Sequence, residues 1–400
     1  MQIVPVNTPA LENEWLHVDR VIYKGDPNWV PFIKQEVQKI FDPKKNKLLR
    51  SGEAMRWILR DAKGSAIGRI AAFVNPQYSK EFKNVDGVGG VGFFECINNK
   101  EAAHLLFDTA RNWLSEKGMQ AMDGPINLGE KLNYWGCIIE NFSAPATFGM
   151  NYNPSYYPEL FQSYGFDVYY EQHVFHRSLL DPAQEVFVRK AEMLKLDPEV
   201  YVSNIRGWDD HKFARNFMEV YNDAWGGHDG FKPLTYEAAM KTYKGLKQVY
   251  DPDIVIFVFK KDRPIGFYVN LPELNQVFKY VGGNMNLLGK IKYVLNRKFR
   301  HPKTMYGIIF GVVKDYQGRG VEGAMIKYAE TDLAPLGRYS DTILNWIGDF
   351  NPKMLHVCEN LGAKLWRRYA TYRYYFDRER PFERAPIIGR ARSKEGTQHE

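Results

Sequence analysis

The sequence predicts an α/β protein in which one mixed-sheet domain occurs twice in tandem, each copy with a mostly antiparallel central sheet flanked by helices. Two observations support this prediction. Apolar runs and turn signals follow the same order in both halves of the chain, and short landmarks recur at a nearly constant offset. The landmarks are Ile67-Gly68 with Ile265-Gly266 and Asn153-Pro154 with Asn351-Pro352, each 198 positions apart, and Tyr164-Gly165-Phe166 with Leu361-Gly362-Ala363, 197 apart. Two unrelated α/β domains are the alternative.

Length and composition fit two globular domains. The chain has 400 residues, 44% hydrophobic and 25% charged, more than one core usually organises. Its cysteines, Cys96, Cys137 and Cys358, are too few and too widely spaced for a disulfide framework or a Cys-x-x-Cys metal site. The first residues lack the regions of a secretory signal, and no later apolar run reaches bilayer length. We therefore expect a cytoplasmic protein with no transmembrane segment and no bound metal.

The first domain is assigned to residues 1–180. Its hairpin is indicated by β-branched and aromatic residues on either side of the turn Asp61-Ala-Lys-Gly64, and its main helix by apolar residues at helical spacing before Gly118. The expected strands are 55–60, 67–74 and 88–96, and the expected helix contains residues 103–114.

The second domain is assigned to residues 209–376, after a linker at 181–208 and before a charged tail at 377–400. It repeats the plan of the first domain, with a turn at Lys260-Lys-Asp-Arg-Pro264 and a proline at the first turn of its last helix. The expected strands are 254–259, 265–269, 306–313 and 342–347. Two expected helices contain residues 213–224 and 325–329, and a third begins near residue 351.

One loop of the second domain carries a chemical signal, because glycines lie between a strand and a helix. Such a loop lets backbone N–H groups approach an anion at the positive end of the helix, and the side chains of Gln317 and Arg319 can add donors. The pattern predicts a diphosphate site formed by Gln317, Gly318, Arg319, Gly320, Val321, Glu322 and Gly323.

This loop resembles the acyl-CoA loop of the GNAT superfamily of N-acyltransferases, which reads Arg/Gln-x-x-Gly-x-Gly/Ala between a strand and a helix. Gln317 and Gly320 match the pattern, whereas Glu322 stands at its last position and Gly323 follows one residue late. A second shared feature is an Asn that opens a helix ending in a Gly-Phe-like pair. It occurs from Asn351 to Gly362-Ala363 and, one residue longer, from Asn153 to Gly165-Phe166, so the resemblance covers most of the chain as a tandem pair.

The resemblance implies an acyl-CoA-dependent N-acyltransferase, expected to move an acetyl group from acetyl-CoA to a small-molecule amine, with an acidic amine as one option. The amine would attack the thioester directly, without a covalent enzyme intermediate. By resemblance, the strand edge at Val312 and Val313 would pair with the pantetheine arm of CoA and polarise the thioester carbonyl. Asn351 would touch the same arm.

Two residues are candidates for proton transfer. Cys358 stands where many relatives have a tyrosine that protonates the leaving thiolate, although a small buried hydrophobe on a helix is an equal interpretation. Asp349, at a strand end, is the candidate general base. The alternative interpretation is a solvated loop carboxylate, which is the commoner kind.

The first domain lacks the loop, since Cys96-Ile-Asn-Asn-Lys100 contains no glycine. We expect this domain to be non-catalytic and to shape the substrate cleft or brace its partner. His173 and His176 lie three residues apart on an expected strand and so face opposite sides, which disfavours a shared metal. His228 lies in a glycine-rich loop near the expected substrate entrance and is either a substrate contact or an ordinary exposed residue.

Three other functions fit parts of the pattern. Gly318, Gly320 and Gly323 also match the Gly-x-Gly-x-x-Gly fingerprint of dinucleotide folds, with Asp349 as the acid, but the preceding strands look antiparallel. A non-catalytic acyl-CoA-binding or interaction protein fits the departures Glu322 and Cys358. An aminoacyl-tRNA-dependent transferase is the third, because some of those enzymes also pair two such domains.

The net charge of +7 is concentrated locally, because no acidic residue occurs between Glu273 and Asp315. This segment combines an apolar helical stripe with lysines, which is typical of a solvated face but can also receive an acidic substrate, an acyl chain or an anionic membrane surface. Nucleic acid is disfavoured because the stacking pattern of single-strand binders is missing, and we expect no DNA partner. The stripe is Leu287, Leu288, Ile291, Val294 and Leu295, beside Lys290, Lys292 and Lys298.

Overall fold

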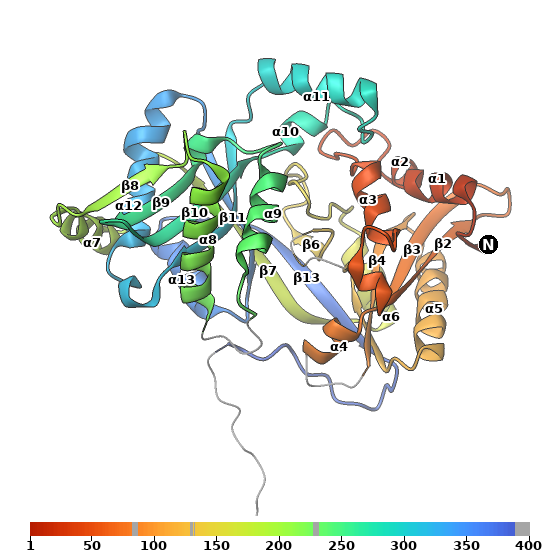
Figure 1. Ribbon diagram of the computed structural model, residues 1–400. Helices are drawn as coiled ribbons and strands as arrows, with labels where there is room; N and C mark the ends of the chain where they lie inside the picture. The colour runs from red at the N-terminus through yellow and green to blue at the C-terminus, as the bar shows by residue number, and fades with distance from the viewer. Residues whose placement is uncertain (82–86, 129–130, 132, 227–231, 389–400) are drawn as a thin grey trace, which may run out of the picture.

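The computed structural model describes residues 1–81, 87–128, 131, 133–226 and 232–388. The described strands form one continuous sheet in the order β1-β2-β3-β4-β5-β13-β7-β12-β11-β10-β9-β8, with β6 paired to β13. Figure 1 shows β2–β4 and β8–β11 on opposite sides of the molecule and β7 and β13 between them. The expected α/β fold with two mostly antiparallel halves is confirmed.

The first half of the chain folds into these elements: β1 (Gln2–Pro5), α1 (Pro9–His17), α2 (Asp19–Ile22), α3 (Lys34–Phe41), β2 (Glu53–Arg60), β3 (Ala66–Val74), α4 (Pro76–Glu81), β4 (Val88–Cys96), α5 (Lys100–Glu116), β5 (Ala121–Gly124), β6 (Cys137–Glu140), α6 (Tyr157–Tyr164) and β7 (Asp167–Ser178). Its core lies between the sheet and helices α5 and α6. The expected hairpin, third strand and long helix are β2, β3, β4 and α5.

The second half folds into α7 (Glu185–Lys195), β8 (Val200–Asn204), α8 (Asp210–Trp225), α9 (Tyr236–Leu246), β9 (Val255–Lys260), β10 (Arg263–Pro272), α10 (Asn275–Phe278), α11 (Leu287–Phe299), β11 (Thr304–Val312), α12 (Val321–Tyr328), β12 (Asp341–Gly348), α13 (Pro352–Asn360) and β13 (Lys364–Tyr375). Helix α7 and strand β8 lie within the segment expected as a linker. β8 adds an antiparallel edge to β9, and α7 packs on α12.

The sequence repeat corresponds to equivalent positions in the two halves. A side chain at Gly68 in β3 would meet Leu106 of α5 at 2.9 Å, and one at Gly266 in β10 would meet Val321 of α12 at 2.6 Å. Both glycines therefore let a helix pack closely on the sheet. Gly165 and Gly362 follow α6 and α13 with φ values of 103° and 75°, a left-handed conformation that glycine adopts at little cost.

The last strand of each half of the chain pairs with strands of the other half in the sheet. β13, at the end of the chain, lies between β5 and β7, while β7 pairs antiparallel with β12. Residues of β13 such as Tyr372 pack in the core of the first half, and Phe175 of β7 packs with Ile347 and Cys358 of the second half. The two halves thus share a sheet and exchange strands.

Buried arginines on the exchanged strands fix this arrangement. Arg373 of β13 makes two hydrogen bonds to Asp123 of β5 at 2.7 and 2.8 Å, and both side chains are fully buried. Arg367 of β13 donates to carbonyl groups of residues 141, 144 and 145 of the first half. Arg177 of β7 donates to the Leu361 carbonyl and pairs with Glu330, both in the second half.

The segment after β13 is hydrogen-bonded to the rest of the chain as far as residue 388. Ala385 N–H donates to the Tyr169 carbonyl at 2.9 Å, and Ile388 N–H donates to the Phe350 carbonyl at 2.8 Å. In the described residues, no helix is both long and apolar enough to cross a bilayer.

We expect Asp123→Ala to destabilise the protein by about 3 to 5 kcal/mol, because it leaves the Arg373 guanidinium buried without its counter-charge. The control is Glu140→Ala. Glu140 pairs with Arg368 on the same strand β13, but half of its side chain is exposed, so its loss should cost less than about 1 kcal/mol. Denaturant unfolding of both variants measures this difference, and equal effects would contradict a special role for the buried pair.

Candidate functional site

The sheet of the second half opens between β11 and β12. These strands pair in parallel only where residues Thr304–Gly307 of β11 lie beside residues Asp341–Leu344 of β12. On the other edge of β11, Ile308 is an extra residue in the pairing with β10, and such a bulge bends a strand. Beyond this point Ile308 to Phe310 and Leu344 to Trp346 are half-exposed. The strands therefore separate into a V whose closed end lies at Gly307.

The corresponding opening in the first half is filled by the chain itself. β4 and β5 pair in parallel only over Val88–Gly90, but Ile126 N–H then donates to the Val91 carbonyl at 2.8 Å. A Cβ atom at Gly92 would lie 1.7 Å from the Ile126 carbonyl oxygen. Asn99 caps helix α5 by accepting from Ala102 N–H, where the second half has its glycine loop.

Unusual polar groups gather at the closed end of the V. The Asn345 side chain donates to the Tyr306 hydroxyl, while Asn345 Oδ1 and Trp346 Nε1 are buried without a partner among the described residues. Trp346 has φ 59°, a strained conformation for a large side chain. Unpaired buried polar atoms and backbone strain cluster at functional sites, so this point is the centre of the candidate site.

Glu273 lies near this point, directly after β10. Its Oε1 accepts from the N–H groups of Phe148 and Asn275 at 2.9 and 3.0 Å, whereas Oε2 is buried and has no partner in the part of the chain that the structure describes. Burial raises the pKa of Glu273 to about 7, although its backbone hydrogen bonds and the charge of Arg367 oppose the shift. Burial raises the pKa of Tyr306, and the charge of the nearby Glu273 carboxyl raises it further. A buried carboxyl that titrates near neutral pH is suited to proton transfer.

Two adjoining cavities lie on the first-half side of this site. The larger, of about 600 Å³, has a wall formed by residues of both halves, including Phe32, Tyr134, Phe148 and Phe278. The smaller, of about 140 Å³, shares Leu48 and Asn127 with it. Volumes of several hundred Å³ are typical of sites for small organic ligands.

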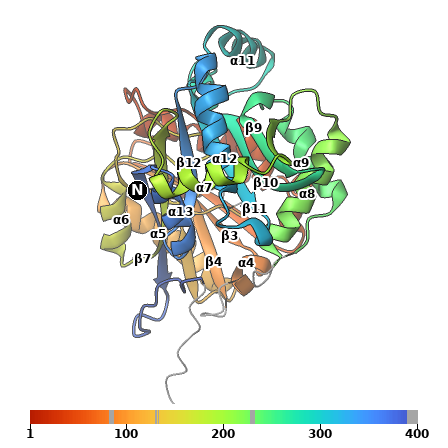
Figure 2. The ribbon, with the colours of Figure 1, turned by 90° about the vertical axis from the view of Figure 1, so that its left-hand side faces the viewer.

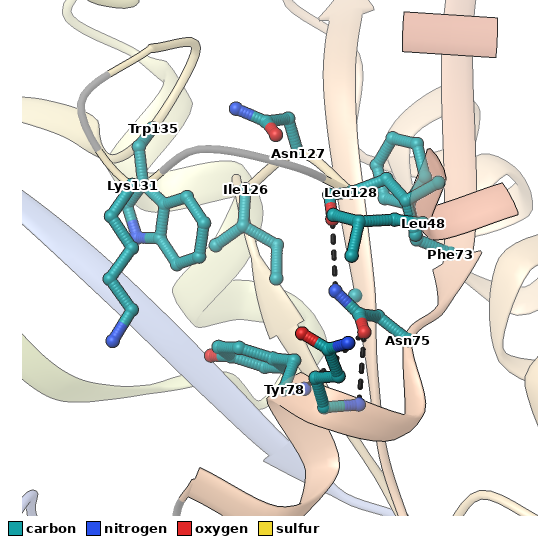
Figure 3. A pocket seen from close by; sticks show the side chains of 11 residues that line it. Leu48, Phe73, Asn75, Tyr78, Ile126, Asn127, Leu128, Lys131 and Trp135 are labelled. Carbon is teal, nitrogen blue, oxygen red and sulfur yellow. Dashed lines mark hydrogen bonds between the residues drawn. The ribbon is translucent and has the colours of Figure 1, made fainter. Parts of the chain in front are cut away.

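The smaller cavity is linked to the V by one of its lining residues, Trp135. In Figure 3, Trp135 and Lys131 line one side and Tyr78 lies below, while Asn75 donates to the Leu128 carbonyl at 3.0 Å. The Trp135 ring lies 6.4 Å from the Trp346 ring at the closed end of the V. First-half residues therefore line the smaller cavity beside the second-half site, and residues of both halves line the larger one.

The predicted diphosphate loop is only partly open. Gln317, Gly318 and Arg319 are exposed, but Gly320, Val321, Glu322 and Gly323 are buried. The Glu322 carboxylate accepts from Gly318 N–H at 3.5 Å, a long hydrogen bond that places a negative charge inside the turn. Gly320 has φ 97°, so the backbone conformation itself requires glycine there.

Helix α7 covers the buried part of the loop. Figure 2 shows α7 crossing α12 near the start of α12. A Cβ atom at Gly320 would lie 2.3 Å from the Lys190 carbonyl oxygen, and one at Gly323 would lie 3.0 Å from Ala191 Cβ. Both glycines thus allow a close helix crossing, a packing reason for the motif that does not involve a ligand.

Of the other predicted cofactor contacts, Val312, Val313 and Gln317 lie together at the open end of the V, and Asn351 begins the helix that follows β12. Val313 N–H donates to the Ile265 carbonyl at 3.1 Å, so by strand alternation Val312 directs its backbone groups toward the opening. Gln317 Nε2 already donates to the Val312 carbonyl at 3.1 Å. Asn351 caps α13 by accepting from Met354 N–H.

The two residues considered for proton transfer lie in different surroundings. Asp349 follows β12 by one residue and accepts from Arg384 at 2.5 Å, and burial raises its pKa despite that arginine. It lies five residues beyond Leu344, about 16 Å along a strand, and so at the open end of the V. Cys358 is fully buried beside Phe175 and Ile347, and this burial raises its pKa to about 12.

The histidines have separate partners. His173 contacts Glu171 and His176 contacts Asp341, each at 3.2 Å. No cluster of three metal-ligating side chains occurs in the described part of the chain. His228 lies outside the described residues.

The strand order, the V between β11 and β12 and the helix after β11 define the class: the chain has the GNAT fold, in tandem. The fold resembles the GCN5-related glucosamine N-acetyltransferase region of a fungal multi-domain β-N-acetylglucosaminidase, with a TM-score of 0.52 and 14% identity. The similarity covers 93% of this chain and 38% of that protein. The antiparallel order β8-β9-β10-β11 before the loop also excludes the parallel sheet of a dinucleotide fold.

Two relatives match the chain almost from end to end. Bacterial ceramide synthase from Caulobacter vibrioides is 26% identical over 392 residues, which cover 94% of this chain and 97% of that protein. Protein YghO from Escherichia coli is 23% identical over 360 residues, covering 88% and 89%. No protein-family model matches the chain.

The sequence contains no pattern that marks Glu273, Tyr306, Asn345 or Trp346 as site residues. Each looks ordinary in sequence, since an acid after a strand and aromatics within strands are common. Only the bulge, the diverging strands and the burial of their polar atoms bring them together.

We expect Glu273→Gln to change the pH dependence of stability. Because the folded-state pKa of Glu273 is raised above its usual value of 4.5 to about 7, the folded protein binds the proton more tightly and the wild type loses stability as pH rises through this interval. The variant lacks this loss, so its stability relative to wild type should rise by roughly 3 kcal/mol between pH 4 and 8.

Denaturant unfolding at several pH values measures this difference. Glu95→Gln serves as a matched variant, because burial also raises the pKa of Glu95 to about 7 in the first half and the same trend is expected. A difference between Glu273→Gln and wild type that stays constant with pH would refute the shift.

Proposed function

We propose that the chain is an N-acyltransferase that joins a fatty acyl group to the amine of a long-chain lipid base. The observation that carries the proposal is the end-to-end similarity to a bacterial ceramide synthase, on a fold shared with an N-acetyltransferase region. A ceramide is the amide of a fatty acid and a long-chain amino alcohol. A fatty acyl group thus replaces the acetyl group expected from the loop.

The proposed reaction is a direct transfer. The amine nitrogen attacks the thioester carbonyl carbon, the new C–N bond forms, and the C–S bond breaks to release a thiolate that takes up a proton. The attacking nitrogen loses one proton to a base. The chain supplies placement, a base and polar groups for the carbonyl oxygen.

We place the reacting carbonyl at the closed end of the V. There Trp346 Nε1 is a buried donor that no described residue pairs with, suited to a developing negative charge. Glu273, whose pKa burial raises to about 7, is our proposed proton acceptor in place of Asp349, which lies at the open end. We assign Asp349 to the acyl-donor entrance.

The adjoining cavities are our proposed site for the lipid amine. Their walls combine aromatic and aliphatic side chains with polar groups such as Asn127 and Asn275, which suits an amphiphile better than a small polar amine. In this proposal the first half binds the acceptor and has no donor loop of its own.

Acyl-CoA is the proposed donor, bound by the loop and by the open edge at Val312. Because α7 covers Gly320 and Gly323, we infer that the diphosphate displaces this helix. The closed loop also favours a second candidate, a non-catalytic acyl-CoA-binding protein.

The direct test supplies the purified chain with palmitoyl-CoA or acetyl-CoA and sphinganine, and follows thiol release and amide formation by mass spectrometry. We expect the palmitoyl amide, and at least a hundredfold loss of kcat in Glu273→Gln but not in Glu95→Gln. CoA binding without turnover supports the second candidate. If the chain shows no CoA binding and no turnover, both candidates are refuted.

We expect Ala191→Phe to tighten acyl-CoA binding at least threefold, because a large side chain against Gly323 holds α7 away from the loop and raises the binding-competent population. Met193→Phe is the control, since Met193 is exposed on the same helix. Isothermal calorimetry with palmitoyl-CoA measures both. Unchanged affinity in Ala191→Phe would mean that α7 does not control access to the loop.

A further inference from the structure

Helix α11 exposes a continuous apolar face. Six large apolar side chains on this helix are between 47% and 77% exposed: Leu287, Leu288, Ile291, Val294, Leu295 and Phe299. At 100° per residue they occupy an arc of about 140°. Figures 1 and 2 both show α11 as an outermost element at the top of the molecule. Contiguous exposed apolar surface of this kind marks an interaction site.

The opposite face of α11 attaches the helix to the protein. Gly289 is buried, the Tyr293 ring lies 5.4 Å from the Phe278 ring, and Arg297 donates to the carbonyls of Gln248 and Tyr250 at 2.9 and 2.8 Å. These contacts fix the rotation of the helix about its axis. The apolar face, on the other side of the helix, therefore points away from the protein.

Cationic side chains flank the apolar face. Lys290 and Lys292 are exposed on its two borders and Lys298 lies within it, while no acidic residue occurs from 274 to 314. An apolar face with cationic borders suits the interface of an anionic bilayer, where the apolar side chains enter the acyl boundary and the lysines meet the headgroups.

We propose that α11 is an interfacial helix that docks the protein on an anionic lipid bilayer. The alternative occupant is a second copy of the chain. A two-fold pairing of α11 faces would bring the same lysines together with no acidic residue on the helix to neutralise them. The charge pattern therefore favours lipid over self-association.

Docking through α11 would also bring the larger cavity close to the membrane. Tyr293 on the inner face of α11 packs on Phe278, and Phe278 forms part of the cavity wall. If the cavity binds a lipid amine, as the proposed function requires, the substrate can come from the bilayer. The docking itself does not depend on that function and is measured without substrate.

The test is sedimentation of the full chain with vesicles of phosphatidylcholine and phosphatidylglycerol at 3:1, and with vesicles of phosphatidylcholine alone, at physiological ionic strength. We expect at least tenfold tighter binding to the anionic vesicles. Leu288→Glu with Leu295→Glu should weaken that binding at least tenfold. The matched control is Leu180→Glu with Leu336→Glu, two leucines outside α11 that are 76% and 54% exposed, and it should bind like wild type.

Lys290→Gln with Lys292→Gln should remove most of the preference for anionic vesicles. Circular dichroism confirms that each variant folds. The proposal is refuted if wild type does not sediment with anionic vesicles, or if the α11 and control variants lose binding equally. It is also refuted if light scattering without lipid shows a dimer that the α11 variant dissociates.

Discussion

The exchange of the last strands, held by buried arginines, is the constraint on which the rest of the structure depends. Arg373 on β13 is fully buried and needs Asp123 on β5, in the other half of the chain, because an unpaired charge in a protein interior is very costly. Arg177 on β7 meets the same need with Glu330 and backbone carbonyls. Each half therefore completes its sheet only when the other half is folded beside it.

This constraint explains why the two copies can differ in role. Because β7 and β13 join both halves into one sheet, the first half lies beside the V between β11 and β12. Its own V is filled by Ile126. Its smaller cavity lies beside the V of the second half, because Trp135 in the cavity wall contacts Trp346. In the proposed function, one copy keeps the chemistry while the other forms the acceptor site.

The loop before α12 shows how one glycine pattern can satisfy two physical demands. Backbone N–H groups near a helix start attract a diphosphate, but absent side chains also allow a helix to cross closely. In this structure Gly320 and Gly323 meet the second demand, because α7 lies within contact distance of both. The covering helix came from a segment expected as a linker, so its effect on the loop could not be foreseen from the motif.

The sequence by itself determined the repeated plan of strands and helices, because apolar periodicity, turn residues and paired landmarks such as Gly68 and Gly266 are local signals that each half contains in full. It also identified the apolar and basic faces of α11. Only the tertiary structure decided the strand exchange, the covering of Gly320 by α7 and the gathering of Glu273, Tyr306 and Trp346 at the closed end of the V. These depend on contacts between residues far apart in the chain, and burial, which sets their chemistry, is a property of the packed molecule.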